Sequence, residues 1–344
     1  METIAPAVRI SLSAVAAACL LLGSPTHRTE AQETRISGLF FGDYYAVVSH
    51  QDDAVDGAHG FWARRMYLTV DHRFDPTWDV RVRFEALSPG DFQTSAALEP
   101  FLKDLWVRWR QGEHQVLVGI SPSPTWNLWE AQWGYRHVEK TPLDLYRMGS
   151  SRDFGVSVLG SFDRDRTLRY HVMVGNGAGV RSETNKGKKV MGSLQFFSSR
   201  GLTLEAYADW EDRSGEEERT TAAAHAVLEG DRGRLGLMAT HQLRRIRGAP
   251  NVNVDVISLF GVLDTGSRTN LLARWDRLAT PIPGAHGIAY FRMAPTSRGH
   301  FFLLGVDLAL AERVHLVPNL EVVTYDDSAL SSDVFLKTTF SVTF

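Results

Sequence analysis

The sequence has a single cysteine, Cys19, among its 344 residues. This excludes a disulfide scaffold and every metal site that needs several cysteines. The chain also lacks a charge excess, because 37 Lys and Arg residues stand against 40 Asp and Glu residues, a formal charge of −3. The balance argues against a general nucleic-acid binder, which needs a basic excess, and against a highly charged disordered chain.

Long apolar runs are also absent. Beyond the N-terminus no 18 consecutive residues are apolar, so no transmembrane helix is expected in the body of the chain. The one apolar run, Ile10 to Leu22, follows Arg9 and precedes a polar stretch that ends in Thr29-Glu30-Ala31. This order predicts a secretory signal peptide over residues 1–31, with a buried core helix as the alternative.

From residue 32 onward the sequence alternates with a period of two, which is typical of β-strands. In 78–86, Asp79, Arg81, Arg83 and Glu85 share one face, and four charges cannot enter an apolar core without partners. That face must meet water or a polar lumen. Similar alternation marks sixteen segments: 36–49, 61–74, 78–88, 102–111, 114–120, 152–161, 167–176, 188–198, 202–210, 219–229, 233–242, 252–263, 269–277, 300–309, 314–324 and 333–344.

The connections between these segments alternate between short turns and longer loops. Among the longer ones are 211–218, 243–251 and the longest, 121–151. Short turns at one end and long loops at the other predict an all-β fold, an antiparallel transmembrane barrel of about 16 strands over 32–344. The ending Phe340-Ser341-Val342-Thr343-Phe344 resembles the signal by which bacterial outer-membrane barrels are recognised for assembly. A soluble sandwich or propeller is the alternative, but it needs neither feature.

A barrel of sixteen strands is too wide for its own side chains to fill, so something must narrow its channel. The third long loop, 121–151, contains Trp126, Trp129 and Trp133 at a spacing that places them on one helical face. We expect this loop to fold inward as the constriction. The alternative is an outward loop whose tryptophans pack on neighbouring loops or on a partner subunit.

Cations on the predicted inward faces indicate how such a channel treats ions. A ring of positive charge at a narrow point attracts anions, and arginine forks suit phosphate or carboxylate oxygens. A mild anion preference follows, unless nearby carboxylates such as Glu85, Asp104 and Asp276 pair with these cations. The candidate pore-lining, anion-binding residues are Arg65, Arg81, Arg83, Arg108, Arg136, Lys140, Arg274 and Lys337.

Several short motifs, in order along the chain, resemble the phosphate-selective porin O and P family. They are Gly119-Ile120-Ser121-Pro122, 151–156 (SRDFGV), 174–177 (VGNG), 273–276 (ARWD), Gly305-Val306-Asp307 and Val317-Pro318-Asn319. The resemblance implies a homotrimeric, sixteen-stranded outer-membrane porin that passes anions. In this chain carboxylates stand among the inward cations. The resemblance therefore supports the porin assignment better than it supports phosphate specificity. Arg152 and Asp153 fall within a matching motif and could be a structural pair at a loop base.

The sequence offers little for catalysis, since G-x-S-x-G, H-E-x-x-H and Walker motifs do not occur. We therefore expect no enzyme, no cofactor and no metal site. The expected function is a porin for small hydrophilic solutes, with a non-conducting anchor or adhesin, or a barrel hydrolase, as alternatives. The expected partners are the lipid bilayer, lipopolysaccharide, small anionic or polar solutes and further copies of the chain, with no nucleic acid.

Overall fold

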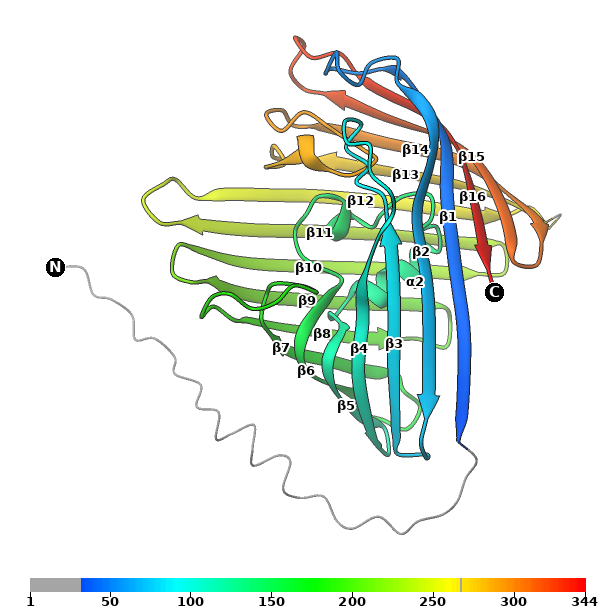
Figure 1. Ribbon diagram of the computed structural model, residues 1–344, viewed down its shortest axis with the longest axis vertical. Helices are drawn as coiled ribbons and strands as arrows, with labels where there is room; N and C mark the ends of the chain where they lie inside the picture. Colours follow the sequence, from blue (N-terminus) through cyan, green and yellow to red (C-terminus); the bar gives the residue numbers. More distant parts are fainter. Residues whose placement is uncertain (1–31, 267) are drawn as a thin grey trace. The chain divides into compact units, whose positions relative to one another are not determined.

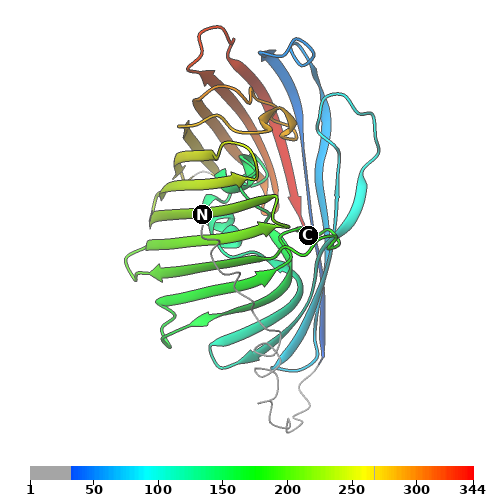
Figure 2. The ribbon, with the colours of Figure 1, turned by 90° about the vertical axis from the view of Figure 1, so that its left-hand side faces the viewer.

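The computed structural model describes residues 32–266 and 268–344, and in this part the chain forms a closed barrel of sixteen antiparallel strands (Figures 1 and 2). Each strand pairs with its sequence neighbours, and β1 closes the barrel against β16. The elements are β1 (Glu33–Ser49), β2 (His59–Arg73), β3 (Trp78–Leu87), β4 (Glu99–Gln111), β5 (His114–Pro122), α2 (Trp126–Trp133), α3 (Pro142–Leu145), β6 (Arg152–Ser161), β7 (Leu168–Gly175), β8 (Lys189–Phe197), β9 (Leu202–Arg213), β10 (Glu217–Gly230), β11 (Gly233–Ile246), β12 (Val252–Asp264), β13 (Thr269–Leu278), the 3₁₀ turn η1 (Ala285–Gly287), β14 (Gly299–Ala311), β15 (Val314–Tyr325) and β16 (Asp333–Thr343).

The predicted fold class is confirmed, and all sixteen predicted segments correspond to strands. The predicted signal peptide, 1–31, lies outside the described residues. None of the helices in the described part is long and apolar enough to cross a membrane.

The polarity of the strands is inverted relative to a water-soluble β-protein. In β9 the side chains of Leu204 and Trp210 are exposed, whereas those of Glu205, Asp209 and Glu211 point inward and are buried. An outer wall of exposed apolar side chains is stable only in an apolar solvent, and a closed barrel leaves no unpaired strand edge there. The soluble sandwich and propeller alternatives are therefore excluded.

Two of the predicted long loops are shorter than expected. Strands β9, β10 and β11 extend past their apolar segments and leave only turns at 214–216 and 247–251. Charged cross-strand pairs accompany the extensions, with 3.2 Å between Arg213 and Glu217 and 3.7 Å between Arg245 and Glu218. A hydrophobic pattern cannot reveal strand residues whose neighbours are charges rather than apolar groups.

The seam between β1 and β16 uses the terminal phenylalanine. The amide of Phe344 donates to the carbonyl oxygen of Gly38 at 3.0 Å, and the amide of Gly38 donates to the carbonyl oxygen of Phe344 at 2.8 Å. The Phe344 ring lies over Gly38, and the Phe340 ring lies beside Gly42. Aromatic rings thus cover the places where the first strand has no side chain.

Bulges in two strands change which cations enter the barrel. In β2, Phe41 pairs with Arg65 and Gly42 pairs with Ala63, so Arg64 is an extra residue. In β4, Arg83 pairs with Asp104 and Phe84 pairs with Leu102, which makes Lys103 an extra residue. A bulge lets two successive side chains point to the same face. Arg64 joins Arg65, and Lys103 joins Asp104, inside the barrel.

The bulge in β2 leads to a first prediction, at Gly42. A Cβ atom there would lie 2.1 Å from the carbonyl oxygen of Trp62, whereas at Gly192 nothing lies within 4 Å. We expect Gly42→Ala to destabilise the barrel by about 1–3 kcal/mol because backbone must move. Gly192→Ala, the matched control on β8, should have little effect. The measurement is the temperature at which each variant loses its compact electrophoretic mobility. Equal temperatures for the two variants would contradict the argument.

Candidate functional site

The connection between β5 and β6, residues 123–151, folds into the barrel and is called L3 below (Figure 1). The three tryptophans of its helix α2 are 1–2% exposed. The Trp126 ring centroid lies 5.9 Å from that of Tyr207, and the Trp129 ring lies 4.4 Å from that of His225. The predicted inward fold of this loop is confirmed, and the outward alternative is excluded.

The barrel wall behind the tryptophans carries apolar side chains among polar ones. Buried aromatic side chains bury large areas, so this contact holds L3 firmly against one side of the lumen. Polar groups of L3 bond to both sides of the barrel, Glu139 to Arg64 of β2 and Thr125 to Glu205 of β9. The inward apolar residues of β7 to β13 are Met173, Met191, Tyr207, Ala223, Val227, Met238, Val254, Val256, Phe260, Val262, Leu272 and Leu278.

A second apolar cluster fills the interior beside β1 and β2. Tyr45 and Trp62 stack with their ring centroids 3.8 Å apart. Phe92, from the connection between β3 and β4, lies 4.8 Å from Trp62, and Tyr290, from the connection between β13 and β14, lies 5.1 Å from it. Three connections therefore contribute side chains to the interior, and the space that is left is polar.

A buried ion network joins L3 to the wall. Arg64 lies 3.1 Å from Asp43 and 3.7 Å from Glu139 of L3. Lys337 lies 3.8 Å from the same Glu139 and 2.5 Å from Glu321. All five side chains are nearly or fully buried, so each charge depends on its partners. Arg64 was missed from the sequence, although the shift in phase of the apolar residues between Phe61 and Met66 is a signal of the bulge.

All eight predicted pore residues face the interior, and most are paired with carboxylates. Lys140 instead donates to the carbonyl oxygen of Ala289 at 3.3 Å. Arg274 and Lys337 are covered by L3, so they lie apart from the open space. The pairs are Arg65–Glu85 (2.7 Å), Arg81–Asp71 (2.7 Å), Arg83–Asp104 (3.1 Å), Arg108–Asp79 (2.5 Å), Arg136–Asp144 (2.9 Å), Lys337–Glu321 (2.5 Å) and Arg274–Asp276.

Arg152 and Asp153 hold the bases of loops rather than each other. The guanidinium of Arg152 donates to Asp104 of β4. The Asp153 carboxylate accepts the backbone amides of Phe154 at 2.8 Å and Gly177 at 2.7 Å. These contacts fix L3 to β4 and the connection after β7 to β6, so the motif has a structural role here.

Two internal cavities lie on the two sides of L3. The loop-side cavity, about 760 Å³, and the turn-side cavity, about 510 Å³, share one described lining residue, Ser123. In both linings the cations outnumber the acids, although the chain carries a net charge of −3. Some of these cations pair with carboxylates outside the lining, as Arg81 does with Asp71 and Arg219 with Glu217. The loop-side lining has the cations Lys140, Arg147, Arg152, Arg181, Lys189, Arg213, Arg219 and Arg244 and the acids Asp144, Asp153 and Glu211, and the turn-side lining has Arg81, Arg108, Arg166, Arg169 and Glu113.

Burial and neighbouring charges shift the pKa values of two side chains of L3, Asp144 and Lys140. Burial opposes the ionisation of Asp144, but Arg136, Lys140, Arg65 and Lys103 outweigh it and hold the pKa of Asp144 below its ordinary value. Burial lowers the pKa of Lys140 to about 8, although neighbouring carboxylates favour its charged form. L3 therefore carries an ammonium group that loses its charge near pH 8.

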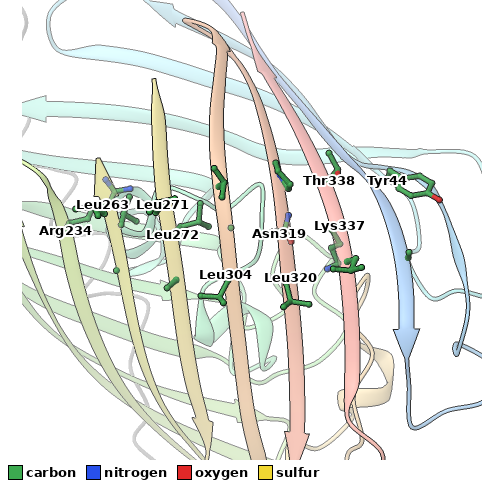
Figure 3. Close-up of a pocket in the computed structure, with 18 residues that line it drawn as sticks. Tyr44, Arg234, Leu263, Leu271, Leu272, Leu304, Asn319, Leu320, Lys337 and Thr338 are labelled. Atoms are coloured by element: carbon green, nitrogen blue, oxygen red, sulfur yellow. The ribbon is translucent and has the colours of Figure 1, made fainter. Parts of the chain in front are cut away.

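A further hollow lies on the outer wall over β11 to β16 and β1 (Figure 3). Leu263, Leu271, Leu304 and Leu320 border it and are exposed or half-buried. The charged end of Lys337, which also borders it, is bound inside the barrel to Glu321. The hollow is bordered mainly by apolar side chains, with Tyr44, Arg234, Asn319 and Thr338 as its other labelled residues (Figure 3).

Solved structures with the same architecture are outer-membrane proteins. An anion-selective porin from Comamonas acidovorans matches with a TM-score of 0.67 and 13% identity, over 91% of this chain and 100% of that chain. OmpT of Vibrio cholerae matches with a TM-score of 0.65 and 10% identity, over 92% of this chain and 99% of that chain. The outer membrane channel DcaP of Acinetobacter baumannii matches with a TM-score of 0.63 and 11% identity, over 93% of this chain and 99% of that chain. The chain has a porin-like fold.

No family model and no curated protein sequence matches the chain. At 10–13% identity the likeness to the solved structures concerns the fold alone. The resemblance to the phosphate-selective family therefore stays a prediction.

The anchoring of L3 leads to a second prediction. Trp129→Ala removes a buried ring from the apolar contact, which costs about 3–5 kcal/mol, so we expect L3 to leave the wall. Trp210→Ala, on the outward face of β9, is the matched control. Trypsin should then cut the folded Trp129→Ala barrel within L3, at Arg136, Lys140 or Arg147, and leave the control intact. Equal resistance of the two variants would refute this account of the anchor.

Proposed function

We propose that this protein is a channel of the bacterial outer membrane that lets small hydrophilic solutes diffuse passively, with a mild preference for anions. One observation carries the proposal: two cavities with a basic lining lie on the two sides of an inward-folded loop in a barrel. Positive charge along a passage raises the local concentration of anions and repels cations.

The outer wall supports a location in a bilayer. Leu235, Leu263, Leu304 and Leu336 are each about half exposed or more, on neighbouring or nearby strands. Full burial of a leucine side chain is worth about 1.5–3 kcal/mol, and each of these half-exposed side chains gains part of that when an apolar surrounding replaces water. The lipid bilayer is thus the proposed partner of the outer wall, and lipopolysaccharide is the proposed partner of its loop-side rim.

The preference for anions is proposed to be mild because most inward arginines already have carboxylate partners. Pairs such as Arg81–Asp71 and Arg274–Asp276 neutralise each other at close range. The net effect on a passing ion then comes from the excess cations of the two cavities. Small phosphate-like and carboxylate ions fit the arginine forks among them.

A homotrimer is proposed as the assembly. One structure of OmpT from Vibrio cholerae with this fold is described as a trimer form. A trimer predicts that conductance appears in groups of three equal steps.

A non-conducting barrel is the second candidate function, favoured by the filling of the interior. Apolar side chains from L3 and from two other connections occupy much of the lumen. Ser123, through which the two cavities adjoin, is 2% exposed. An anchor or adhesin would need no continuous passage there.

The third prediction separates the two candidates. The purified folded protein in a planar lipid bilayer should give stepwise conductance, and its reversal potential across a KCl gradient should show preference for chloride. Block by added phosphate would further support phosphate-like solutes. Steps without ion preference would remove the charge argument, and no conductance from a folded barrel would favour the anchor.

The fourth prediction concerns pH. With a pKa of about 8, Lys140 is about nine-tenths charged at pH 7 and about one-tenth charged at pH 9. Since the charged form is lost as the pH rises, we expect chloride preference to fall between pH 7 and pH 9. Lys140→Arg, which stays charged over this range, should abolish most of the fall. A fall of the same size in that variant would place the titrating group elsewhere.

A further inference from the structure

The hollow on the outer wall crosses the strands instead of following one of them. Its volume is about 930 Å³, and its labelled side chains form a band across the strands (Figure 3). The band runs from β11 through β16 to β1. Neighbouring strands lie about 4.8 Å apart, so the band is roughly 29 Å long. One acyl chain spans half of a hydrocarbon core about 30 Å thick, so the hollow is long enough to hold one.

Small outward residues make the wall recede along this band. They are Gly261 of β12, Ala273 of β13 and Ala46 of β1. Exposed leucines such as Leu263 and Leu304 border the same band. A gap between side chains forfeits dispersion contacts, so an apolar chain that lies over the small residues recovers them.

Two hydroxyl groups gather at one end of the hollow. Thr338 of β16 pairs in register with Tyr44 of β1, and both face the hollow. Within residues 32–266 and 268–344 neither hydroxyl has a hydrogen-bond partner. Polar groups without partners are unfavourable on a surface that faces hydrocarbon, so these hydroxyls indicate a polar group on whatever fills the hollow.

A proline adds an acceptor at the same place. Pro318 of β15 pairs in register with Thr338 and borders the hollow. Proline has no amide hydrogen, and in the described chain the β14–β15 ladder stops at the pair Gly305–Asn319 and resumes beyond Pro318. Val306, which stands opposite Pro318, therefore receives no hydrogen bond from it. Its carbonyl oxygen is available beside the two hydroxyls.

The position of these groups along the strands indicates which lipid leaflet they meet. Tyr44 lies five residues from Ser49, and Thr338 lies five residues from Asp333, where β1 and β16 meet the longer connections. Leu263, at the other end of the hollow, is the last residue but one of β12 beside a short turn. The polar end of the hollow is thus the end nearer the loop side.

We propose that the hollow binds a single acyl chain that carries a hydroxyl group, from a lipid of the loop-side leaflet. The hydroxyl of the chain bonds to Thr338, Tyr44 and the carbonyl oxygen of Val306, and its tail lies over Ala273 and Gly261. The inference deepens the proposed contact with lipopolysaccharide and rests on it, since that lipid supplies hydroxylated acyl chains. It does not depend on conduction.

The test counts lipids bound to the folded full chain in detergent by native mass spectrometry. One titration uses lipid A with 3-hydroxyacyl chains, and the other uses phosphatidylethanolamine, whose chains lack hydroxyls. Gly261→Phe fills the hollow, because a Cβ atom there meets only Leu235, at 3.7 Å. Gly192→Phe is the matched control, since it lies on the outward face of β8, apart from the hollow, with nothing within 4 Å.

We expect the native chain and Gly192→Phe to retain one tightly bound lipid A. Gly261→Phe should bind it about tenfold more weakly, the effect of losing roughly two buried methylene groups. Thr338→Val keeps the size of the side chain but removes the hydroxyl, so it should weaken lipid A binding about three- to tenfold and leave phosphatidylethanolamine unchanged. Thr338→Ser should restore the binding of lipid A.

Three results would overturn the proposal. They are equal lipid A binding by Gly261→Phe and Gly192→Phe, an equal effect of Thr338→Val on both lipids, and dissociation of the lipid-free oligomer by Gly261→Phe. The last result would make the hollow an interface between copies of the chain. If Gly261→Phe does not fold, Ala273→Phe, on the neighbouring strand, gives the same comparison.

The outcome is separable from that of the channel proposal. A barrel that does not conduct but shows this pattern of lipid A binding would refute the channel and support the lipid site. A conducting barrel that binds both lipids alike would support the channel and refute the lipid site.

Discussion

The hydrogen-bonding requirement of the backbone in an apolar solvent governs the rest of this structure. Hydrocarbon supplies no partner for a free amide or carbonyl, so a sheet that crosses it must close on itself. The closure is made between β1 and β16, where the final residue, Phe344, pairs with Gly38. Closure then divides every strand into an outward apolar face and an inward face that can hold charge.

The inward faces are not uniform, and their asymmetry positions the candidate site. Apolar side chains from β7 to β13 hold the tryptophans of L3, while β2 to β5 carry paired charges. The loop is thus attached on one side by hydrophobic contact and on another by the buried network around Glu139. A loop attached in this way leaves cavities on its two sides instead of one wide channel.

Much of this arrangement follows from the sequence because alternation with period two is a local property. It placed all sixteen strands, and the spacing of three tryptophans identified the inward loop. Register and bulges are not local. Alternation assigned Arg65 to the lumen, but it had no means to place Arg64 or Lys103 there too, because each depends on which partner residue is skipped. The ion pairs that neutralise the predicted cations likewise join strands whose relative register only the fold provides.

The local charge of the interior differs from that of the chain as a whole, and this matters more for function than the total. Carboxylates are numerous, but many form ion pairs that join strands to each other or to loops. Asp104, for example, binds both Arg83 and Arg152. The excess cations, Arg244 among them, lie where β9 to β11 extend beyond their apolar segments and meet the end of L3. Because electrostatic interactions are strong where water is scarce, the charges that line these cavities act on a solute there more strongly than distant charges on the surface do.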